Sequence, residues 1–394
     1  MLNAMSKLLQ FYGADQKMQE KYIILLDPKG IILGDITTLE RHLNYGTSLK
    51  TIKSEYRLVI FSSTRMKNHK DVQHDDSKII PIRSGHLPLI FSLKVRKRIR
   101  RNYRHNLIAY VVGDPWYSFL EYQLVTLFQK RKFPVQVQIH SEIANPDWYR
   151  ANLKNWIKFY LAWYPFKKAD SIRSVSEAQK SDIVCKYNLV ATKISVVHPP
   201  LNVFPNFEVN DLVRPRTIGF VGRIAKDRGT NLLLELISSL NQVDKSFKIV
   251  IIGGGPELDR LSSSLKKTLG PDRVMIKGKL NQKELNEAWA GIGVLVSLSS
   301  TESYGRTIRE ANAMGIPVWS TPTSGFLELH FQTQKLGTEI LNTADKPDQL
   351  LHSFNKLLVA DLKCRSQKTI MDSNHKQIVA LCRSWVELIE QDSR

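Results

Sequence analysis

The chain has 394 residues, a length that corresponds to two or three domains of about 150 residues each. Apolar residues make up 42% and charged residues 24%, close to the globular average, which excludes a chain that is disordered throughout. Lysine and arginine outnumber aspartate and glutamate by 57 to 37, and the net charge of +20 favours a polyanionic partner: nucleic acid, an anionic membrane or a phosphorylated substrate.

The first half of the chain alternates short apolar runs with longer amphipathic segments. Such runs predict buried strands, which we expect at residues 22–26, 57–61, 107–112, 134–139, 171–175 and 194–197. We expect helices at residues 37–53 and 147–168, and Ser176 with Glu177 marks the start of another helix. The pattern then turns polar between residues 202 and 215.

A fresh alternation begins after this polar stretch. The expected strands are 217–221, 247–252, 274–276, 294–298 and 317–320, and the expected helices are 231–240, 256–269, 282–290 and 307–314. Buried strands that alternate with helices indicate parallel sheets. We therefore predict an α/β protein with two parallel-sheet domains, residues 1–210 and 211–394, and the last helix, within residues 375–394, is a candidate to pack back on the first domain.

Cysteine content and hydropathy limit the cellular setting. Three cysteines, Cys185, Cys364 and Cys382, are an odd number at wide spacings, which argues against a disulfide framework or a zinc knuckle. No apolar run approaches the roughly 20 residues that span a bilayer, and residues 1–20 lack the apolar core of a signal peptide. We expect a cytoplasmic protein, soluble or peripheral on the cytoplasmic face of the membrane.

The segment from Thr301 to Glu310 carries the sharpest chemical signal. Glu302 follows a predicted strand, at the carboxyl edge where open α/β sheets bind ligands. Gly305 lets the backbone approach a ligand, and the amides after it open a helix whose N-terminus suits a diphosphate. Glu310, eight positions after Glu302, has a carboxylate that can accept both hydroxyl protons of a ribose diol. The alternative is a pair of solvated helix charges.

Together with residues 311–318, this segment closely resembles the signature of retaining glycosyltransferases of family 4. Those enzymes have the GT-B fold, two Rossmann-like domains that face a cleft. Other segments similar to the family follow its order: 137–140, 169–177, 219–223 with 228–229, 250–256, 278–280 and 324–328. The resemblance covers residues 105–330 well and residues 20–60 weakly.

The resemblance implies a nucleotide-sugar site in the second domain and an acceptor site in the first. The implied catalytic residues are His140, Glu302, Arg223 and Arg228. The implied donor-binding residues are Gly222, Lys226, Gly254, Gly278, Lys279, Ser303, Tyr304, Gly305, Arg306, Thr307 and Glu310. In this scheme Glu310 holds the ribose, Glu302 approaches the hydroxyls of the transferred sugar, and His140 lines the cleft near the reacting centre.

The phosphate loop departs from the family's pattern. The family usually has lysine where this chain has Arg228, with Lys226 two residues earlier, so either side chain can take the diphosphate. These cations, with Arg223 and the helix amides, supply positive charge for the leaving group. No Asp-x-Asp run stands at a strand end. We therefore expect a metal-independent hexosyl transfer with no cofactor, and the resemblance implies retention of the anomeric configuration.

Two other segments bear on partners. Residues 94–104 hold seven cations and no acid, and Val95, Ile99 and Tyr103 form a narrow apolar stripe at helical spacing. That pattern is typical of a helix on an anionic membrane, and a solvated basic helix is the alternative. The aromatic helix with Trp148, Trp156, Phe159, Tyr160 and Trp163 is expected in the core, and membrane contact is the alternative.

The leading hypothesis is a retaining glycosyltransferase that builds a surface polysaccharide or glycolipid on a saccharide or lipid-linked acceptor. A GT-B epimerase of sugar nucleotides is the nearest enzymatic rival. A nucleic-acid-binding protein is an alternative of another class, but the chain lacks zinc, RNP-type and helix-turn-helix signatures. The sequence leaves open the sugar, the base, the acceptor, the linkage formed and the oligomeric state.

Overall fold

The computed structural model describes residues 20–392 except for residues 35, 67–69, 75, 128, 130–132 and 205–213. The chain divides into two compact units. Unit 1 comprises Met1–Gln138, Pro165–Ile172 and Ile378–Arg394, and unit 2 comprises Ile139–Tyr164 and Arg173–Gln377. The predicted domain boundary between residues 210 and 211 lies outside the described residues.

The first sheet has eight strands in the order β3-β4-β2-β1-β5-β6-β7-β8. Its strands are β1 Lys21–Asp27, β2 Tyr56–Thr64, β3 Val72–His74, β4 Ser77–Arg83, β5 Leu107–Val112, β6 Val135–Gln138, β7 Ser171–Ser174 and β8 Ile194–Val196. β1, β2, β4, β5 and β6 pair in parallel, as predicted, whereas β3 runs antiparallel to β4. β3 and β4 escaped prediction because β3 is short and β4 contains Lys78 and Pro81, which interrupt the apolar run.

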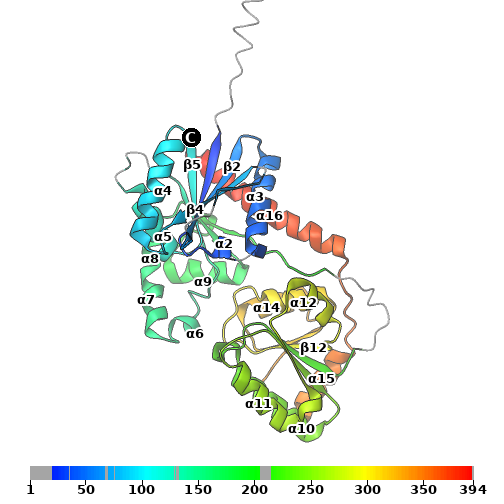
Figure 1. Ribbon diagram of the computed structural model, residues 1–394. Helices are drawn as coiled ribbons and strands as arrows, with labels where there is room; N and C mark the ends of the chain where they lie inside the picture. Colours follow the sequence, from blue (N-terminus) through cyan, green and yellow to red (C-terminus); the bar gives the residue numbers. More distant parts are fainter. Residues whose placement is uncertain are drawn as a thin grey trace, which may run out of the picture. The chain divides into compact units, whose positions relative to one another are not determined.

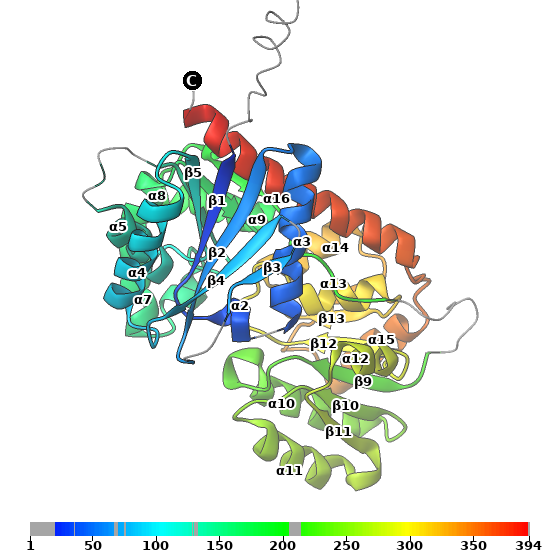
Figure 2. The same cartoon turned by 45° about the horizontal axis from the view of Figure 1, so that its top comes forward.

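Four helices accompany these strands in unit 1. They are α2 Ile31–Gly34, α3 Ile36–Ile52, α4 Pro88–Asn102 and α5 Tyr117–Thr126. α4 and α5 lie together on one side of the sheet and α3 lies on the other (Figures 1 and 2). The second half of α16, Gln367–Asp392, belongs to the same unit, where Trp385 meets Tyr45 of α3 edge to face with ring centroids 5.7 Å apart.

The basic segment forms the C-terminal part of α4, and its apolar stripe has a different role from the one expected. Val95, Ile99 and Tyr103 are at most 6% exposed and pack into the core of unit 1. Lys94, Lys97, Arg98, Arg100 and Arg101 are exposed on the opposite face. The stripe is therefore not available to a membrane, because it is already buried in the core.

The aromatic segment is also corrected by the structure. It forms three short helices, α6 Pro146–Tyr149, α7 Leu153–Leu161 and α8 Trp163–Lys168, rather than one. Trp156, Tyr160 and Trp163 are 46%, 57% and 54% exposed, so the expectation that they lie in the core is wrong. α9 Glu177–Tyr187 begins as predicted, with Ser176 Oγ accepting from the amide of Gln179.

The second sheet lies in unit 2 and is parallel throughout, in the order β11-β10-β9-β12-β13-β14. Its strands are β9 Thr217–Val221, β10 Lys248–Ile252, β11 Val274–Gly278, β12 Val294–Ser297, β13 Val318–Ser320 and β14 Thr338–Ile340. Its helices are α10 Thr230–Val243, α11 Leu258–Leu269, α12 Gln282–Trp289, α13 Arg306–Ala313, α14 Ser324–Gln332 and α15 Pro347–Leu358.

Helices cover both faces of this sheet (Figure 1). Ile249 and Ile251 of β10 join a core with α10, α11 and α15, whereas Val250 and Ile252 join a core with α12, α13 and α14. Strands that are buried on both faces consist of continuous apolar residues. These strands could therefore be predicted from the sequence. The predicted α/β architecture of two parallel-sheet domains is confirmed. Within the described ranges, no helix combines the length and the apolarity that crossing a membrane requires.

Candidate functional site

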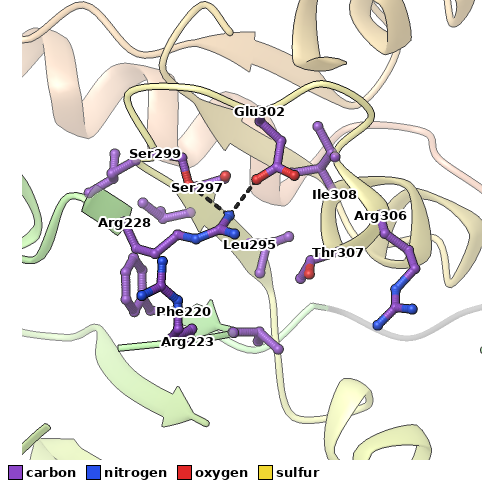
Figure 3. A pocket seen from close by; sticks show the side chains of 15 residues that line it. Phe220, Arg223, Arg228, Leu295, Ser297, Ser299, Glu302, Arg306, Thr307 and Ile308 are labelled. Carbon is purple, nitrogen blue, oxygen red and sulfur yellow. Dashed lines mark hydrogen bonds and ion pairs between the residues drawn. The ribbon is translucent and has the colours of Figure 1, made fainter. Parts of the chain in front are cut away.

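A pocket in unit 2 opens at the carboxyl ends of the neighbouring strands β9 and β12. It has a volume of about 310 Å³. Seven of the residues predicted for the donor site line it: Gly222, Arg223, Arg228, Glu302, Gly305, Arg306 and Thr307. The first three come from the loop after β9 and the other four from the loop after β12 and the start of α13 (Figure 3). The sheet order thus brings together two sequence motifs that are about 80 residues apart.

Two glycines shape this pocket. Gly229 has φ +76°, and a Cβ there would lie 2.2 Å from the carbonyl oxygen of Leu298, so only glycine lets the two loops approach this closely. Gly305 has φ +69° and is the N-cap residue of α13. The first amides of α13, which have no partner within the helix, therefore begin at the pocket wall and favour an anion there.

Charged side chains dominate the pocket. Arg228 Nη1 lies 2.5 Å from Glu302 Oε2 and 3.2 Å from the hydroxyl of Ser299, as Figure 3 shows. Arg223 pairs with Asp227, an exposed residue of its own loop. The pocket is thus lined by three guanidinium groups, those of Arg223, Arg228 and Arg306. Among the lining residues, Glu302 contributes the one carboxylate. The cavity suits a ligand with negative charge and hydroxyl groups.

An adjoining hollow continues from the first pocket. The two share Val221, Gly222 and Arg223, and the second is lined further by Gly253, Gly254, Gly255 and Lys279. A Cβ at Gly254 would lie 3.1 Å from Lys279 Cε, so the lysine stem lies against the glycine turn. Gly254 and Lys279 therefore lie next to the first pocket, and their part in donor binding stays a prediction.

Lys226, Gly278 and Tyr304 do not line either hollow. Lys226 is exposed, whereas Arg228 lines the pocket, and which of the two contacts a diphosphate stays a prediction. Gly278 accepts a hydrogen bond from the amide of Gly253 at 2.7 Å at the end of β11. The Tyr304 side chain lies in a different pocket, with Arg309 4.5 Å above its ring, and burial raises its pKa.

Glu310 is buried behind the pocket wall. It is 4% exposed, and its Oε1 accepts from the amide of Asn202 at 3.1 Å and lies 3.5 Å from Arg306 Nε. Burial raises the pKa of Glu310, while Arg306 and the Asn202 amide oppose that rise. Glu310 is not among the lining residues, so its predicted contact with a ribose remains a prediction.

His140 and Ser303 lie close to each other. The carbonyl oxygen of His140, an exposed residue after β6, is 3.5 Å from Ser303 Oγ in the loop that carries Glu302. The loop from Ile139 to Asn145 therefore adjoins the Glu302 loop within unit 2. The roles assigned to these residues stay predictions.

Glu142 belongs to this group and was not predicted from the sequence. It is 5% exposed, and its Oε2 accepts from Ser324 Oγ at 3.1 Å, while the same hydroxyl also lies 3.1 Å from the carbonyl oxygen of Glu302. Its Oε1 has no hydrogen-bond partner among the described residues. Burial raises the pKa of Glu142 to about 7, with smaller upward contributions from Asp182 and Glu302. Only tertiary burial distinguishes this carboxylate from a surface one.

Metal-binding side chains do not gather anywhere in the described part of the chain: no group of three or more His, Cys, Asp or Glu side chains has an arrangement that could hold an ion.

Comparison with known families identifies the part of the chain that carries this pocket. Residues 206–370 match the sequence profile of glycosyl transferases group 1. This segment is therefore similar to the glycosyl transferases of group 1. A curated relative, the D-inositol 3-phosphate glycosyltransferase of Corynebacterium jeikeium, is 27% identical over 213 residues, which are 49% of this chain and 50% of the relative. The chain thus matches half the length of that relative.

Solved structures are similar in fold to nearly the whole chain. Sucrose-phosphate synthase from Thermosynechococcus elongatus matches with a TM-score of 0.66 and 15% identity over 95% of this chain and 98% of that one. Anabaena HepE in complex with UDP-glucose matches with a TM-score of 0.58 and 14% identity, over 94% and 97% of the two chains. The fold is therefore GT-B, as the sequence predicted.

Proposed function

We propose that the chain is a glycosyltransferase that moves a sugar from a nucleotide-sugar donor to a saccharide or lipid-linked acceptor with retention of configuration. The observation that carries the proposal is the pocket of unit 2, where three arginines and the N-terminus of α13 surround Glu302. The group 1 match over residues 206–370 supports it, since that segment contains every residue lining this pocket. The solved HepE structure, which holds UDP-glucose, supports a nucleotide-sugar donor.

The chemistry follows from the charges. When the bond between the anomeric carbon and the diphosphate breaks, both electrons pass to a phosphate oxygen, and negative charge grows there. Arg223, Arg228 and the α13 amides provide positive potential at that position without a metal. The acceptor oxygen bonds to the anomeric carbon, and its proton passes to the departing phosphate. Glu302 accepts hydrogen bonds from the hydroxyls of the transferred sugar.

The acceptor is proposed to carry negative charge or to lie at an anionic membrane. In unit 1 a groove is lined by five cations, Arg83, Lys94, Lys97, Arg98 and Arg101, together with Pro81 and Ile82. Among the described residues, no acidic side chain lines it. A phosphate-bearing acceptor head group fits such a surface better than a neutral saccharide does.

The first experiment measures nucleoside diphosphate release and product formation with a panel of nucleotide sugars and acceptors, with and without a chelator. We expect acceptor-dependent release that survives chelation, and NMR of the product should show the donor's anomeric configuration. Interconversion of the free nucleotide sugar with no acceptor present would instead identify an epimerase. An inverted product would contradict retention.

The second experiment separates chemistry from binding. Glu302→Gln and His140→Ala should each lower kcat/KM by roughly 100-fold or more while nucleoside diphosphate affinity is kept. Glu302→Gln removes the partner charge of Arg228, so this variant should bind the diphosphate as well as or better than the parent. Glu287→Gln, an exposed carboxylate on α12, is the matched control. Full turnover in either site variant would remove that residue from the proposed mechanism.

A further inference from the structure

The helix α7 presents its apolar face to solvent. Leu153, Trp156, Ile157, Tyr160 and Leu161 follow the i, i+3, i+4, i+7, i+8 spacing of a single helix face. They are 72%, 46%, 43%, 57% and 60% exposed, and Trp163 and Tyr164 at the start of α8 add 54% and 44%. A face of this kind usually packs on a core. We call these seven residues the α7 surface.

The opposite side of α7 is held firmly in unit 2. Phe159 stacks on Tyr149 of α6 with centroids 4.3 Å apart, and its carbonyl oxygen accepts from the Tyr187 hydroxyl of α9 at 2.9 Å. Asn152 caps the helix by accepting from the amide of Asn155, whose side chain donates to the carbonyl oxygen of Trp148 at 3.0 Å. The exposed apolar face is therefore a fixed feature of the folded unit and not a frayed end.

The sequence around the α7 surface carries an excess of positive charge, with Asp147 and Asp170 as the acids nearest its two ends. Residues 148–168 contain five cations, Arg150, Lys154, Lys158, Lys167 and Lys168, and no aspartate or glutamate. Tryptophan and tyrosine, with an apolar body and a polar tip, are the side chains enriched where hydrocarbon meets water. Lysine extends its charge toward phosphate head groups while its stem stays apolar.

We propose that the α7 surface docks on an anionic lipid surface, with the helix lying in the plane of the interface. The composition is typical of interfacial helices: Trp and Leu on one face, and more cations than acids in the segment that carries them. A second copy of the chain is a poorer occupant, because a symmetric contact would bring two equally cationic rims together. The inference does not depend on the proposed sugar transfer.

The α7 surface and the cations of α4 would contribute to membrane binding through different interactions. The α4 face offers charge with its apolar stripe buried, whereas the α7 surface offers seven large apolar side chains that can leave water. Binding through α7 should therefore persist in part at high salt, because the hydrophobic contribution is not screened.

The test uses flotation of the full chain with vesicles of neutral lipid and with vesicles that contain an anionic lipid. Trp156→Gln with Leu161→Gln should weaken partition to the anionic vesicles by roughly tenfold or more, since each buried side chain of this size is worth about a tenfold factor or better. The matched control is Val359→Gln with Met371→Gln, two apolar side chains that are 83% and 55% exposed elsewhere in unit 2. Unchanged far-UV circular dichroism and an unchanged thermal unfolding midpoint show that each variant is folded.

Tryptophan fluorescence gives an independent readout. Trp289, Trp319 and Trp385 are at most 1% exposed and cannot reach lipid in the folded chain. Brominated anionic lipid should quench the parent protein, and Trp156→Phe with Trp163→Phe should lose most of that quenching while still floating with vesicles. Equal partition of the Gln variant and the parent, or quenching that persists in the Phe variant, overturns the proposal. Loss of a dimer by the Gln variant, with no vesicle binding by the parent, would assign the surface to a second copy instead.

Discussion

Arg228 and Glu302 form an ion pair in the structure. If a nucleotide sugar binds as proposed, its diphosphate has to pair with the guanidinium and its sugar hydroxyls have to donate to the carboxylate, because the half-buried pair would otherwise be left partly unmatched. A single ligand would therefore offer a negative phosphate to Arg228 and hydroxyl donors to Glu302. This complementarity explains how a short arginine-to-glutamate distance is compatible with a binding site.

Glu310 provides a test of the nucleotide subsite. If its carboxylate accepts hydrogen bonds from a ribose, Glu310→Ala should weaken nucleoside diphosphate binding by about 1.5–3 kcal/mol, the worth of a hydrogen bond to a charged group. Calorimetry measures the affinity. Glu310→Gln keeps an acceptor for the Asn202 amide and should lose less. Equal affinity of the folded Ala variant and the parent would restrict Glu310 to holding Asn202.

Glu142 makes the stability of unit 2 depend on pH. Its pKa is about 7 in the folded chain against its usual 4.5, so the folded state holds one more proton between these values. The contribution of Glu142 to stability is therefore present below about pH 4.5 and is lost as pH rises to 7, by up to roughly 3 kcal/mol. Asp182 and Glu302 add to the rise, and Ser324 and Asn145 oppose it.

We expect Glu142→Gln, which removes the charge but keeps the shape, to be stabilising relative to the parent at pH 8 and to lose that advantage at pH 5. Denaturant unfolding at a series of pH values measures the difference. The control is Glu235→Gln, which replaces an exposed carboxylate on α10. Its free energy of unfolding should vary with pH in the same way as that of the parent. If the free energy of unfolding of Glu142→Gln also follows that of the parent from pH 5 to pH 8, Glu142 does not titrate in this range.

At the scale of the element, α4 and α7 show that an apolar helix face flanked by cations can be either buried or exposed. Both helices carry an apolar stripe and several cations. In α4 the stripe is buried against the sheet and the charges face water, whereas in α7 the apolar face is exposed. Helical periodicity indicates that a face is apolar, but which surface covers it depends on the neighbouring elements.

The exposed cations of α4 are expected to add an electrostatic contribution to membrane binding. Replacing Lys97, Arg98, Arg100 and Arg101 with Gln should weaken binding to anionic vesicles steeply at low salt, at roughly 1 kcal/mol for each cation near the surface, and much less at high salt. Sedimentation at several salt concentrations measures this. The control with the same loss of charge replaces four exposed lysines of unit 2: Lys245, Lys248, Lys266 and Lys267. If the control loses as much binding as the α4 variant, net charge and not α4 governs attraction.

At the scale of the whole molecule, the net charge of +20 is spread over both units and is not explained by the donor pocket alone. The pocket uses three arginines, the groove of unit 1 uses five cations, and the segment around α7 uses five more. A chain that meets a diphosphate donor and an anionic surface needs positive charge at each place. The second half of α16 also completes the unit in which the chain begins.

The sequence by itself determined the α/β class, the parallel sheets and many of the residues that line the pocket beside Glu302. Strands buried on both faces and glycines at the turns beside the pocket leave a local signature, because they depend on the residues in one short window. Hence Arg223, Glu302 and Gly305 could be assigned to the pocket from their sequence motifs alone. Three features depend on the tertiary structure alone. Glu142 is buried, Arg228 rather than Lys226 lines the pocket, and the apolar face of α7 is exposed to solvent. Each of these depends on which distant segment packs against the residue, and no local window contains that segment.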